Sequence, residues 1–466
     1  MRKWTKNIVA ASAVVAITAI ASVAGGQATV SQAAGVAITQ KTFKDSGVYA
    51  KAKSADKNND GILSSAEAAT VKDVYFYDET SDISATLKYF PKATEVTILS
   101  VPSSAKTITV NSTKIKKMTI ATSKVVSIKG AAPTEVAIYG NGMKNSFDFS
   151  KATGYNKVKK FSFYGNETKK LVAPNQAKLT NLCVNGTTMT SYNTSKLKSI
   201  KELNLSNNKL KKLNVSKNKN LTSLACYSNK LSALNLSSNK KLKDVGAGDN
   251  NLKKIDVSKN KKITRVVVYR NKIKSLKYPK SNKIKEINVA ANKLTKIEPK
   301  AFKSLISLDV TSNKISKLDV SKNTKLTYLS CADTSVKTLA LSKMKKLTSL
   351  NVAQTSVTKL SLAKSAKLNF ISVGKKYQLL KDVKMSSKGG NSVCMQLLPN
   401  KTYNLTTILP CLNGYEFSTY SQYVNLTPTG KTVFLGNFKK DNYLSAYATK
   451  GKTSVTISFN NAGVFY

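Results

Sequence analysis

The stretch LTSLACYSNKLSALNLSSNKK, residues 221–241, decides the fold of this chain. It holds two half-repeats of the form L-x-x-L-x-Φ-x-x-N, in which Φ is an apolar residue. The apolar positions and closing asparagines are Leu221, Leu224, Cys226 and Asn229, then Leu231, Leu234, Leu236 and Asn239. Alternation within L-x-Φ indicates a short strand with one buried face. Each such unit is therefore predicted to form two short arms whose apolar side chains point inward.

The same register recurs along much of the chain. It places asparagine at Asn166, Asn208, Asn229, Asn250, Asn271, Asn292 and Asn313. Every spacing is 21 residues except the first gap, which has Thr187 at its midpoint, and the register continues as Thr334 and Thr355. A fixed period of this length indicates a solenoid. We expect Asn208 to Asn313 to form a structural ladder that satisfies buried main-chain groups, and a weaker ladder where threonine replaces asparagine.

These motifs resemble the leucine-rich repeat family, and in particular the 21-residue bacterial variety LxxLxCxxNxLxxLDLSxN, internalin-like in broad class. The clear match covers residues 197–373, and degenerate coils with cores such as Met118–Ile120 and Val136–Ile138 extend it upstream to about 91. The resemblance implies a β-rich solenoid with two strand-like arms per coil. It also implies a scaffold whose function depends on variable surface residues.

Four segments are expected. Residues 1–33 read as a signal peptide, with Arg2, Lys3 and Lys6 before an apolar run from Ile8 to Ala24; a short signal anchor is the alternative. Residues 34–90 form an EF-hand-like cap, residues 91–383 the solenoid, and residues 384–466 a β-rich domain. The sequence therefore predicts a protein secreted or displayed at the surface of a Gram-positive bacterium, monomeric and not integral to the membrane after cleavage.

Residues 56–67 fit the twelve-residue EF-hand calcium loop. Gly61 supplies the sharp turn at position six, and the predicted ligands are Asp56, Asn58, Asp60, the carbonyl of Ile62, and Glu67. A calcium-free turn before a short helix is the alternative. We expect a structural Ca²⁺ ion in a hand that caps the first coil.

The chain carries 76 basic and 24 acidic residues, a formal net charge of +52. All the basic residues are lysine except Arg2, Arg265 and Arg270, and arginine is the residue that reads bases and phosphates with a planar fork. Specific nucleic-acid recognition is therefore not expected. The charge fits either attraction to acidic cell-wall polymers or a merely solvated lysine surface.

The outward positions of the first arm differ from the rest of the solenoid. Between residues 201 and 353 their only lysines are Lys201, Lys243 and Lys285. We expect this lysine-poor face to bind a protein or glycan partner, with Tyr227, Arg265, Tyr269 and Tyr328 as its contact residues. Scattered tyrosines on an ordinary surface are the alternative.

The chain contains no histidine, which removes Ser-His-Asp and Cys-His catalysis and the usual near-neutral general base. We therefore expect an interaction protein and not an enzyme. Two alternatives remain: a cationic structural component held by charge to acidic wall polymers, and, less favoured, a hydrolase with an unrecognised carboxylate site.

The five cysteines and the last segment complete the expectations. Cys226 and Cys331 fall on core-facing positions, Cys394 and Cys411 could form a disulfide, and Cys183 is left over. Beyond residue 384, alternating patterns between turn residues predict a small β-sandwich or a terminal cap. The expected strands are Thr402–Leu409, Tyr415–Tyr420, Thr432–Leu435, Leu444–Thr449 and Thr453–Phe459.

Overall fold

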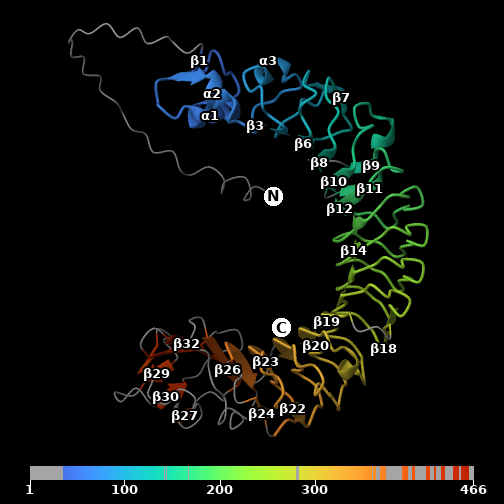
Figure 1. Cartoon of the computed structure of the whole chain (residues 1–466), viewed down its shortest axis with the longest axis vertical. Coiled ribbons are helices and arrows are strands. Elements are labelled where there is room, and N and C mark those ends of the chain that lie inside the picture. Colours follow the sequence, from blue (N-terminus) through green and yellow to red (C-terminus); the bar gives the residue numbers. More distant parts are fainter. Residues whose placement is uncertain are drawn as a thin grey trace, which may run out of the picture.

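The computed structural model describes residues 35–373 with short gaps at 141, 143, 166, 280–282, 359 and 364–367. Beyond residue 373 it describes 391–396, 401–404, 416–419, 424–426, 432–435, 444–450 and 453–460. The predicted signal peptide, Asn166 and Cys411 lie outside the described residues. The chain forms a curved solenoid, with one parallel sheet along the concave side of the arc and the remaining arms on the outer side (Figure 1).

The parallel sheet runs in register from residue 73 to residue 396 of the described chain. Its strands are β3 (Asp73–Phe76), β4 (Glu95–Ile98), β6 (Lys117–Thr122), β8 (Glu135–Gly140), β10 (Lys160–Tyr164), β12 (Asn181–Asn185), β13 (Glu202–Asn204), β14 (Ser223–Ala225), β15 (Asp244–Gly246), β17 (Arg265–Val267), β19 (Glu286–Asn288), β20 (Ser307–Asp309), β21 (Tyr328–Ser330), β23 (Ser349–Asn351), β25 (Phe370–Val373) and β26 (Asn391–Gln396). The predicted leucine-rich-repeat solenoid is thus confirmed.

The coil length explains which part of the repeat was visible in the sequence. From Lys160 to Phe370 the spacing between aligned residues of successive strands is constant and equals the period of the sequence repeat. Upstream the spacing is not constant, since the aligned residues are Asp73, Glu95, Lys117, Glu135 and Lys160. The regular part therefore begins at β10, upstream of the predicted residue 197. The sheet itself begins at β3, inside the segment that the sequence assigned to the cap.

Burial follows the L-x-Φ alternation. In β14 the side chain of Leu224 is buried while Ser223 and Ala225 are partly exposed, and Cys226 is buried in the next turn. Cys331 is likewise buried, so both cysteines occupy the core as predicted. The second arms run behind the sheet, where some pair as short parallel strands: β5 (Thr107–Thr109) with β7 (Ser127–Lys129), β9 (Lys144–Asp148) with β11 (Glu167–Val172), β16 (Lys254–Asp256) with β18 (Ser275–Lys277), and β22 (Leu339–Leu341) with β24 (Leu360–Leu362).

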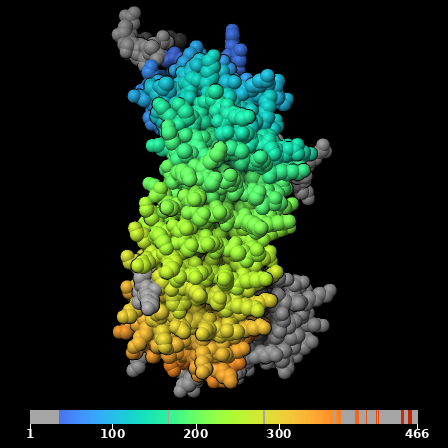
Figure 2. Space-filling view, turned by 90° about the vertical axis from the view of Figure 1, so that its right-hand side faces the viewer, coloured from blue at the N-terminus to red at the C-terminus, as the bar shows by residue number. Residues whose placement is uncertain are grey.

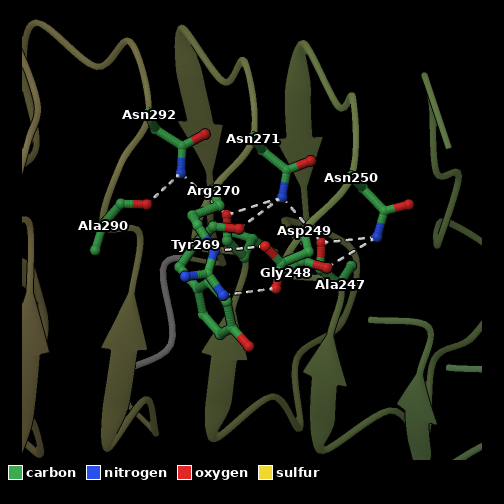
Figure 3. A network of polar contacts seen from close by, with 10 residues as sticks. Ala247, Gly248, Asp249, Asn250, Tyr269, Arg270, Asn271, Ala290 and Asn292 are labelled. Atoms are coloured by element: carbon green, nitrogen blue, oxygen red, sulfur yellow. Dashed lines mark hydrogen bonds and ion pairs between the residues drawn. The ribbon is translucent and has the colours of Figure 1, made fainter. Parts of the chain in front are cut away.

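The predicted asparagine ladder connects successive coils. Asn229 Nδ2 donates to the carbonyl of Leu205 in the preceding coil at 2.8 Å and to those of Cys226 and Tyr227 in its own turn, while its Oδ1 accepts from Leu210 N at 2.9 Å. Asn250, Asn271 and Asn292 repeat this arrangement and lie in a row in Figure 3. Each ladder residue thus satisfies main-chain groups that would otherwise be buried and unpaired. Thr334 Oγ1 donates to Cys331 O within its own turn, so the ladder is thinner there.

The residue before each ladder position turns the chain out of the strand. It has φ near +50°, and the series is Asn207, Ser228, Asp249, Arg270, Ala291, Ser312, Asp333 and Gln354. This left-handed conformation is unfavourable for most residues. The hydrogen bonds of the adjacent ladder residue stabilise the turn in this conformation. We call this turn the exit corner, and the turn that leads from the second arm into the next strand the entry corner.

The N-terminal segment packs directly on the first coil. It contains β1 (Gly35–Ala37), α1 (Ser46–Ala55), β2 (Ile62–Ser64) and α2 (Ser65–Ala68), with β1 and β2 antiparallel. The carboxylate of Asp45 caps α1 by accepting from Gly47 N and Val48 N, and it also accepts from Tyr77 N and Asp78 N after β3. One side chain therefore joins the segment to the sheet. Every helix among the described residues is too short or too polar to cross a bilayer.

The last strands extend the same sheet. β32 (Thr453–Asn460) pairs parallel with β26 and antiparallel with β31 (Leu444–Lys450), which pairs with β28 (Glu416–Ser418). A second sheet joins β27 (Lys401–Asn404), β30 (Thr432–Leu435) and β29 (Val424–Leu426). Five of these strands lie where the sequence placed them. β29 was missed, and so was β26, which continues the parallel sheet beyond residue 383, where the sequence ended the solenoid. The sheet is continuous with the solenoid, as a terminal cap requires; a sandwich stays a prediction.

The convex side is a closed surface of stacked coils (Figure 2).

Candidate interaction surface on the concave sheet

The outward side chains of the concave sheet form three columns that run along the solenoid. The first column comprises the first outward residue of each strand, from Asp73 through Glu202 to Ser349. The middle column lies two residues further on, and the third column two residues beyond that. In-register parallel strands about 4.8 Å apart place the members of each column side by side. Side chains distant in sequence therefore meet here.

The first column is a ladder of ion pairs. At its N-terminal end Lys117 Nζ lies 2.8 Å from Glu95 Oε2, and Lys160 Nζ lies 3.2 Å from Glu135 Oε2. The hydrogen bond that Lys117 donates to Glu95 raises the pKa of Lys117.

Further along, Arg265 bridges two coils, with Nη1 3.1 Å from Asp244 Oδ1 and Nε 3.0 Å from Glu286 Oε2. From Glu95 to Lys160 and from Asp244 to Glu286, adjacent strands thus carry opposite charges, which avoids repulsion between like charges in contact. The charges compensate one another only in part, because these pairs join three basic side chains to four carboxylates and the columns also carry Glu202 and Asp309, so the described face is net acidic.

Exposed aromatic side chains gather on the first coils of the same face. In the third column Tyr77 is 52% exposed, Leu99 47% and Tyr139 46%. Tyr139 and Tyr164 stack with ring centroids 4.9 Å apart, and Tyr75 and Tyr77 meet edge to face. Sequence reasoning missed this cluster, because its coils lack the regular spacing that would have assigned these residues to the sheet. We call Tyr75, Tyr77, Leu99, Tyr139 and Tyr164 the aromatic cluster.

Three of the four predicted contact residues lie together further along. The rings of Tyr227 and Tyr269 stack with centroids 6.0 Å apart, and Arg265 Nη1 donates to Tyr227 Oη at 3.5 Å. Burial, partly offset by the Arg265 hydrogen bond, raises the pKa of Tyr227. Both rings lean over glycines, Tyr227 over Gly246 and Tyr269 over Gly248. The side chains of Tyr227, Arg265 and Tyr269 are half-buried and form a compact group, which we call the shelf.

Tyr328 does not join the shelf. It lies in the first column, three strands beyond Arg265, which is about 14 Å along the sheet. Its neighbour is Asp309 in the middle column, and burial, partly offset by hydrogen bonds from Thr311, raises the pKa of that carboxyl group. The four predicted residues share one face of the solenoid but make two separate sites.

A hollow of about 370 Å³ lies between the aromatic cluster and the shelf. Glu135, Lys160, Asn181 and Glu202 of the first column line one side, and small middle-column residues including Ser162, Cys183 and Ala225 form its floor. Asn181 Nδ2 donates to Glu202 Oε2 at 2.6 Å, which holds that carboxylate at the rim. Cys183 is the leftover cysteine of the sequence, and it lies 3.9 Å from Tyr164 Oη.

The predicted calcium loop connects α1 to β2 and α2. Gly61 N donates to Asp56 Oδ2 at 3.0 Å and Ile62 N to Asp60 Oδ1 at 2.7 Å, so main-chain N–H groups fix both carboxylates. Glu67 closes the loop by accepting from Lys57 N and from Ser64 N. The hydrogen bond from the Ser64 hydroxyl is the main cause that lowers the pKa of Glu67.

One oxygen of the loop has no partner. Asp56 Oδ1 is buried and makes no hydrogen bond among the described residues. A cation would supply the missing partner, and the oxygen-rich set of Asp56, Asn58, Asp60 and Glu67 is of the kind that calcium prefers. Asp56, Asp60 and Glu67 do not gather into a metal-binding cluster in the described structure, so Glu67 would have to turn from its main-chain partners to complete one. The residue types fit calcium, and the arrangement is incomplete.

No family model and no curated protein matches this chain. Solved structures do. The functional domain of InlJ from Listeria monocytogenes is 16% identical, with 93% of this chain and 100% of that one covered and a TM-score of 0.41.

A Leptospira interrogans leucine-rich-repeat protein is 16% identical over 70% and 90% of the two chains, with a TM-score of 0.47. YopM from Yersinia enterocolitica is 14% identical over 76% and 74%, with a TM-score of 0.46. Likenesses this distant say nothing about a partner. The 21-residue repeat, the in-register parallel sheet and the asparagine ladder together make the chain a leucine-rich-repeat solenoid.

Proposed function

We propose that this protein is a secreted or surface-displayed interaction protein that binds a protein partner through its concave sheet. The aromatic cluster is the observation that carries the proposal. Of the six large apolar side chains that are exposed among the described residues, five belong to it, and Ile306 is the sixth. Tyrosine and arginine are enriched in the residues that dominate binding energy at protein interfaces. Exposed apolar surface gathered in one place indicates an interaction site.

The ion pairs beside the cluster favour a protein partner over a glycan. Lys117, Lys160 and Arg265 are each held by a carboxylate of a neighbouring coil, so the face presents ordered charges of both signs between aromatic groups. Apolar anchors surrounded by oriented charges are typical of protein interfaces. The shelf of Tyr227, Arg265 and Tyr269 is the second contact region in this proposal.

The proposed role is non-catalytic. Support comes from the absence of histidine in the sequence and from the first-column carboxylates Glu95, Glu135, Asp244 and Glu286, which are engaged in ion pairs. A hydrolase would need two such groups free to exchange protons with a substrate. The apolar run at residues 8–24 supports secretion.

We further propose that Ca²⁺ binds the loop at residues 56–67 and stabilises the N-terminal segment. The unpartnered Asp56 Oδ1 and the ligand types of the loop support this. Through Asp45 the segment is fastened to the end of β3, so ordering of the loop would stabilise the first coil as well.

Alanine variants test the binding proposal. One variant replaces Tyr75, Tyr77, Tyr139 and Tyr164, a second replaces Tyr227 and Tyr269, and Ile306→Ala is the control for loss of an exposed apolar side chain elsewhere. Proteins from candidate target cells are captured on each variant at 0.15 M salt and compared by quantitative mass spectrometry. A partner held by the wild type and the control, and lost from the first variant, supports the proposal. Capture of the same partners on all four proteins would refute the proposal. Capture of glycans alone would show that the partner is a glycan and not a protein.

A further inference from the structure

Exposed lysines line the entry corner in one coil after another. They stand three or four residues before each strand from β14 to β21, and they are Lys219, Lys241, Lys262, Lys283, Lys303 and Lys325. We call these six residues the entry stripe. Lys198 before β13 and Lys346 before β23 continue it in both directions. The stripe follows one lateral edge of the solenoid, beside the concave sheet and distinct from its three columns.

The fold fixes the spacing of the stripe. Each strand pairs in register with the next, and the entry corners are tied to one another by main-chain bonds such as Thr222 N to Lys201 O and Thr264 N to Lys243 O, each 2.8 Å. Strands about 4.8 Å apart therefore carry the six lysines along roughly 24 Å of the edge. Lys241 Nζ donates to Asn220 Oδ1 of the preceding coil at 2.7 Å, which directs that side chain along the stripe.

The charge of the stripe is uncompensated. In the described part of the chain, the ion pairs involve lysines and arginines of the concave columns, the N-terminal segment, the second arms and the exit corner, and no stripe residue takes part in one. The carboxylates of Asp244 and Glu286, which follow Lys241 and Lys283 by three residues, are engaged by Arg265. Two ammonium groups about 5 Å apart repel each other by about 0.8 kcal/mol in water. A row of them therefore favours a ligand with a matching row of negative charges.

We propose that the entry stripe binds an unbranched, flexible phosphate polymer that lies along the solenoid axis. The stripe contains lysine and no arginine, and an ammonium group neutralises phosphate as a point charge without reading the shape of a base. Recognition is thus by charge spacing and not by sequence.

The edge also follows the arc of the solenoid (Figure 1). A nucleic-acid duplex is stiff over about 150 base pairs and cannot follow such a curve without a bending cost. A single phosphodiester chain can.

This site leaves the concave sheet free. A polymer along the entry corners does not cover the aromatic cluster or the shelf, so the protein could be held on an anionic polymer while its sheet binds a partner. The inference does not depend on the proposed protein partner, because the two surfaces use different residues.

Two charge-matched variants test the stripe. One replaces Lys219, Lys241, Lys262, Lys283 and Lys303 with glutamine. The control replaces the exit-corner lysines Lys209, Lys230, Lys272, Lys293 and Lys314, which are also exposed and remove the same charge, but whose row is interrupted at Asn251. Binding of fluorescent linear poly(glycerol phosphate) is measured by anisotropy at several salt concentrations, on full-length proteins whose melting temperatures are compared first.

We expect the affinity for the polymer to fall strongly in the stripe variant and only slightly in the control. Each phosphate contact contributes about 0.7 to the slope of log K against log salt for a flexible single chain. The slope of the stripe variant should therefore fall by about 3.5, with roughly a hundredfold or greater loss of affinity at 0.15 M salt. The control should lose less than a third of that slope. If the stripe variant melts early, Lys262→Gln with Lys283→Gln should still lower the slope by about 1.4.

Three outcomes would overturn the proposal. Equal losses in both five-lysine variants would mean diffuse attraction by net charge. Equal or tighter binding of duplex DNA of the same charge, with the same dependence on the stripe, would remove the requirement for a flexible chain. Stripe-dependent binding of a sulfated glycan in place of poly(glycerol phosphate) would remove phosphate as the recognised group.

Discussion

The ring of Tyr269 lies so close to Gly248 of the preceding coil that a Cβ on that glycine would stand 2.8 Å from the ring. The glycine is therefore what allows the tyrosine to lie flat across the sheet. We expect Gly248→Ala to push the ring out of place and to cost about 1–2 kcal/mol in the free energy of unfolding. Urea denaturation measures the loss. In a double-mutant cycle with Tyr269→Ala the double variant should lose less than the sum of the single variants, and strict additivity would show that the two residues do not interact.

Removal of one ladder residue should weaken the joint between two coils. Asn250 Nδ2 donates to Cys226 O, Ala247 O and Gly248 O, and its Oδ1 accepts from Leu231 N. Asn250→Ala leaves these buried groups unpaired, so we expect a loss of about 3 kcal/mol in unfolding free energy. The neighbouring Asn251→Ala is the control, because the described structure gives that side chain no hydrogen bond. A comparable loss in both variants would contradict the ladder's role.

Calcium should raise the melting temperature of the wild-type protein by about 3 °C or more when the ion is in large excess. A variant with Asp56→Ala and Glu67→Ala should show no such rise. In the presence of a chelator the variant should still melt earlier than the wild type, because Asp56 and Glu67 accept main-chain hydrogen bonds within the loop, but the gap should be smaller than with calcium. Differential scanning calorimetry with and without millimolar Ca²⁺ makes the comparison. A variant that is equally destabilised in chelator would show that these side chains act through the loop's own hydrogen bonds.

Asp309 and Asp319 should make the stability of the protein depend on pH in opposite directions. Burial holds the pKa of Asp309 above its ordinary value of 3.8. The contribution of this residue to the free energy of unfolding is therefore favourable below pH 3.8, and it is lost as the pH rises through the pKa of the folded state. Asp309→Asn should therefore raise the melting temperature at pH 7, by an amount that shrinks as the pH falls toward 4.

The matched control is Asp319→Asn. The Ser321 hydroxyl lowers the pKa of Asp319, whose contribution is present above pH 3.8 and lost in acid, so this variant should melt earlier at pH 7. Melting curves between pH 4 and pH 8 check both signs. The same sign for the two variants at pH 7 would contradict the assignment.

The sequence predicted the features that a strict period encodes. Because Leu224 and Asn229 recur every 21 residues, the short strands, the buried face and the ladder from Asn208 to Asn313 followed from residue type and spacing alone. The first-column pairs between Asp244, Arg265 and Glu286 carried the same periodic signal and could have been found by aligning the coils.

The sequence did not predict what depends on coils of unequal length. Glu95 pairs with Lys117 and Glu135 pairs with Lys160, and because the two separations along the chain differ, no constant spacing relates these pairs. The sheet tolerates this because its in-register pairing constrains only the strands, while the second arms absorb the extra residues. For the same reason the aromatic cluster could not be assigned to one face before the register of β3 to β10 was known.

The bonds of the ladder have a direction. Each asparagine reaches back to a carbonyl 24 residues earlier, so every coil is completed by the one that follows it. Under tension such a chain should behave as a series of links that open singly, because breaking one joint leaves the others intact. Each link would release one coil, or about 70 Å of extended chain. If the entry stripe is bound to a polymer and the concave sheet to a partner, a pulling force between them would lengthen the solenoid in steps before either contact dissociates.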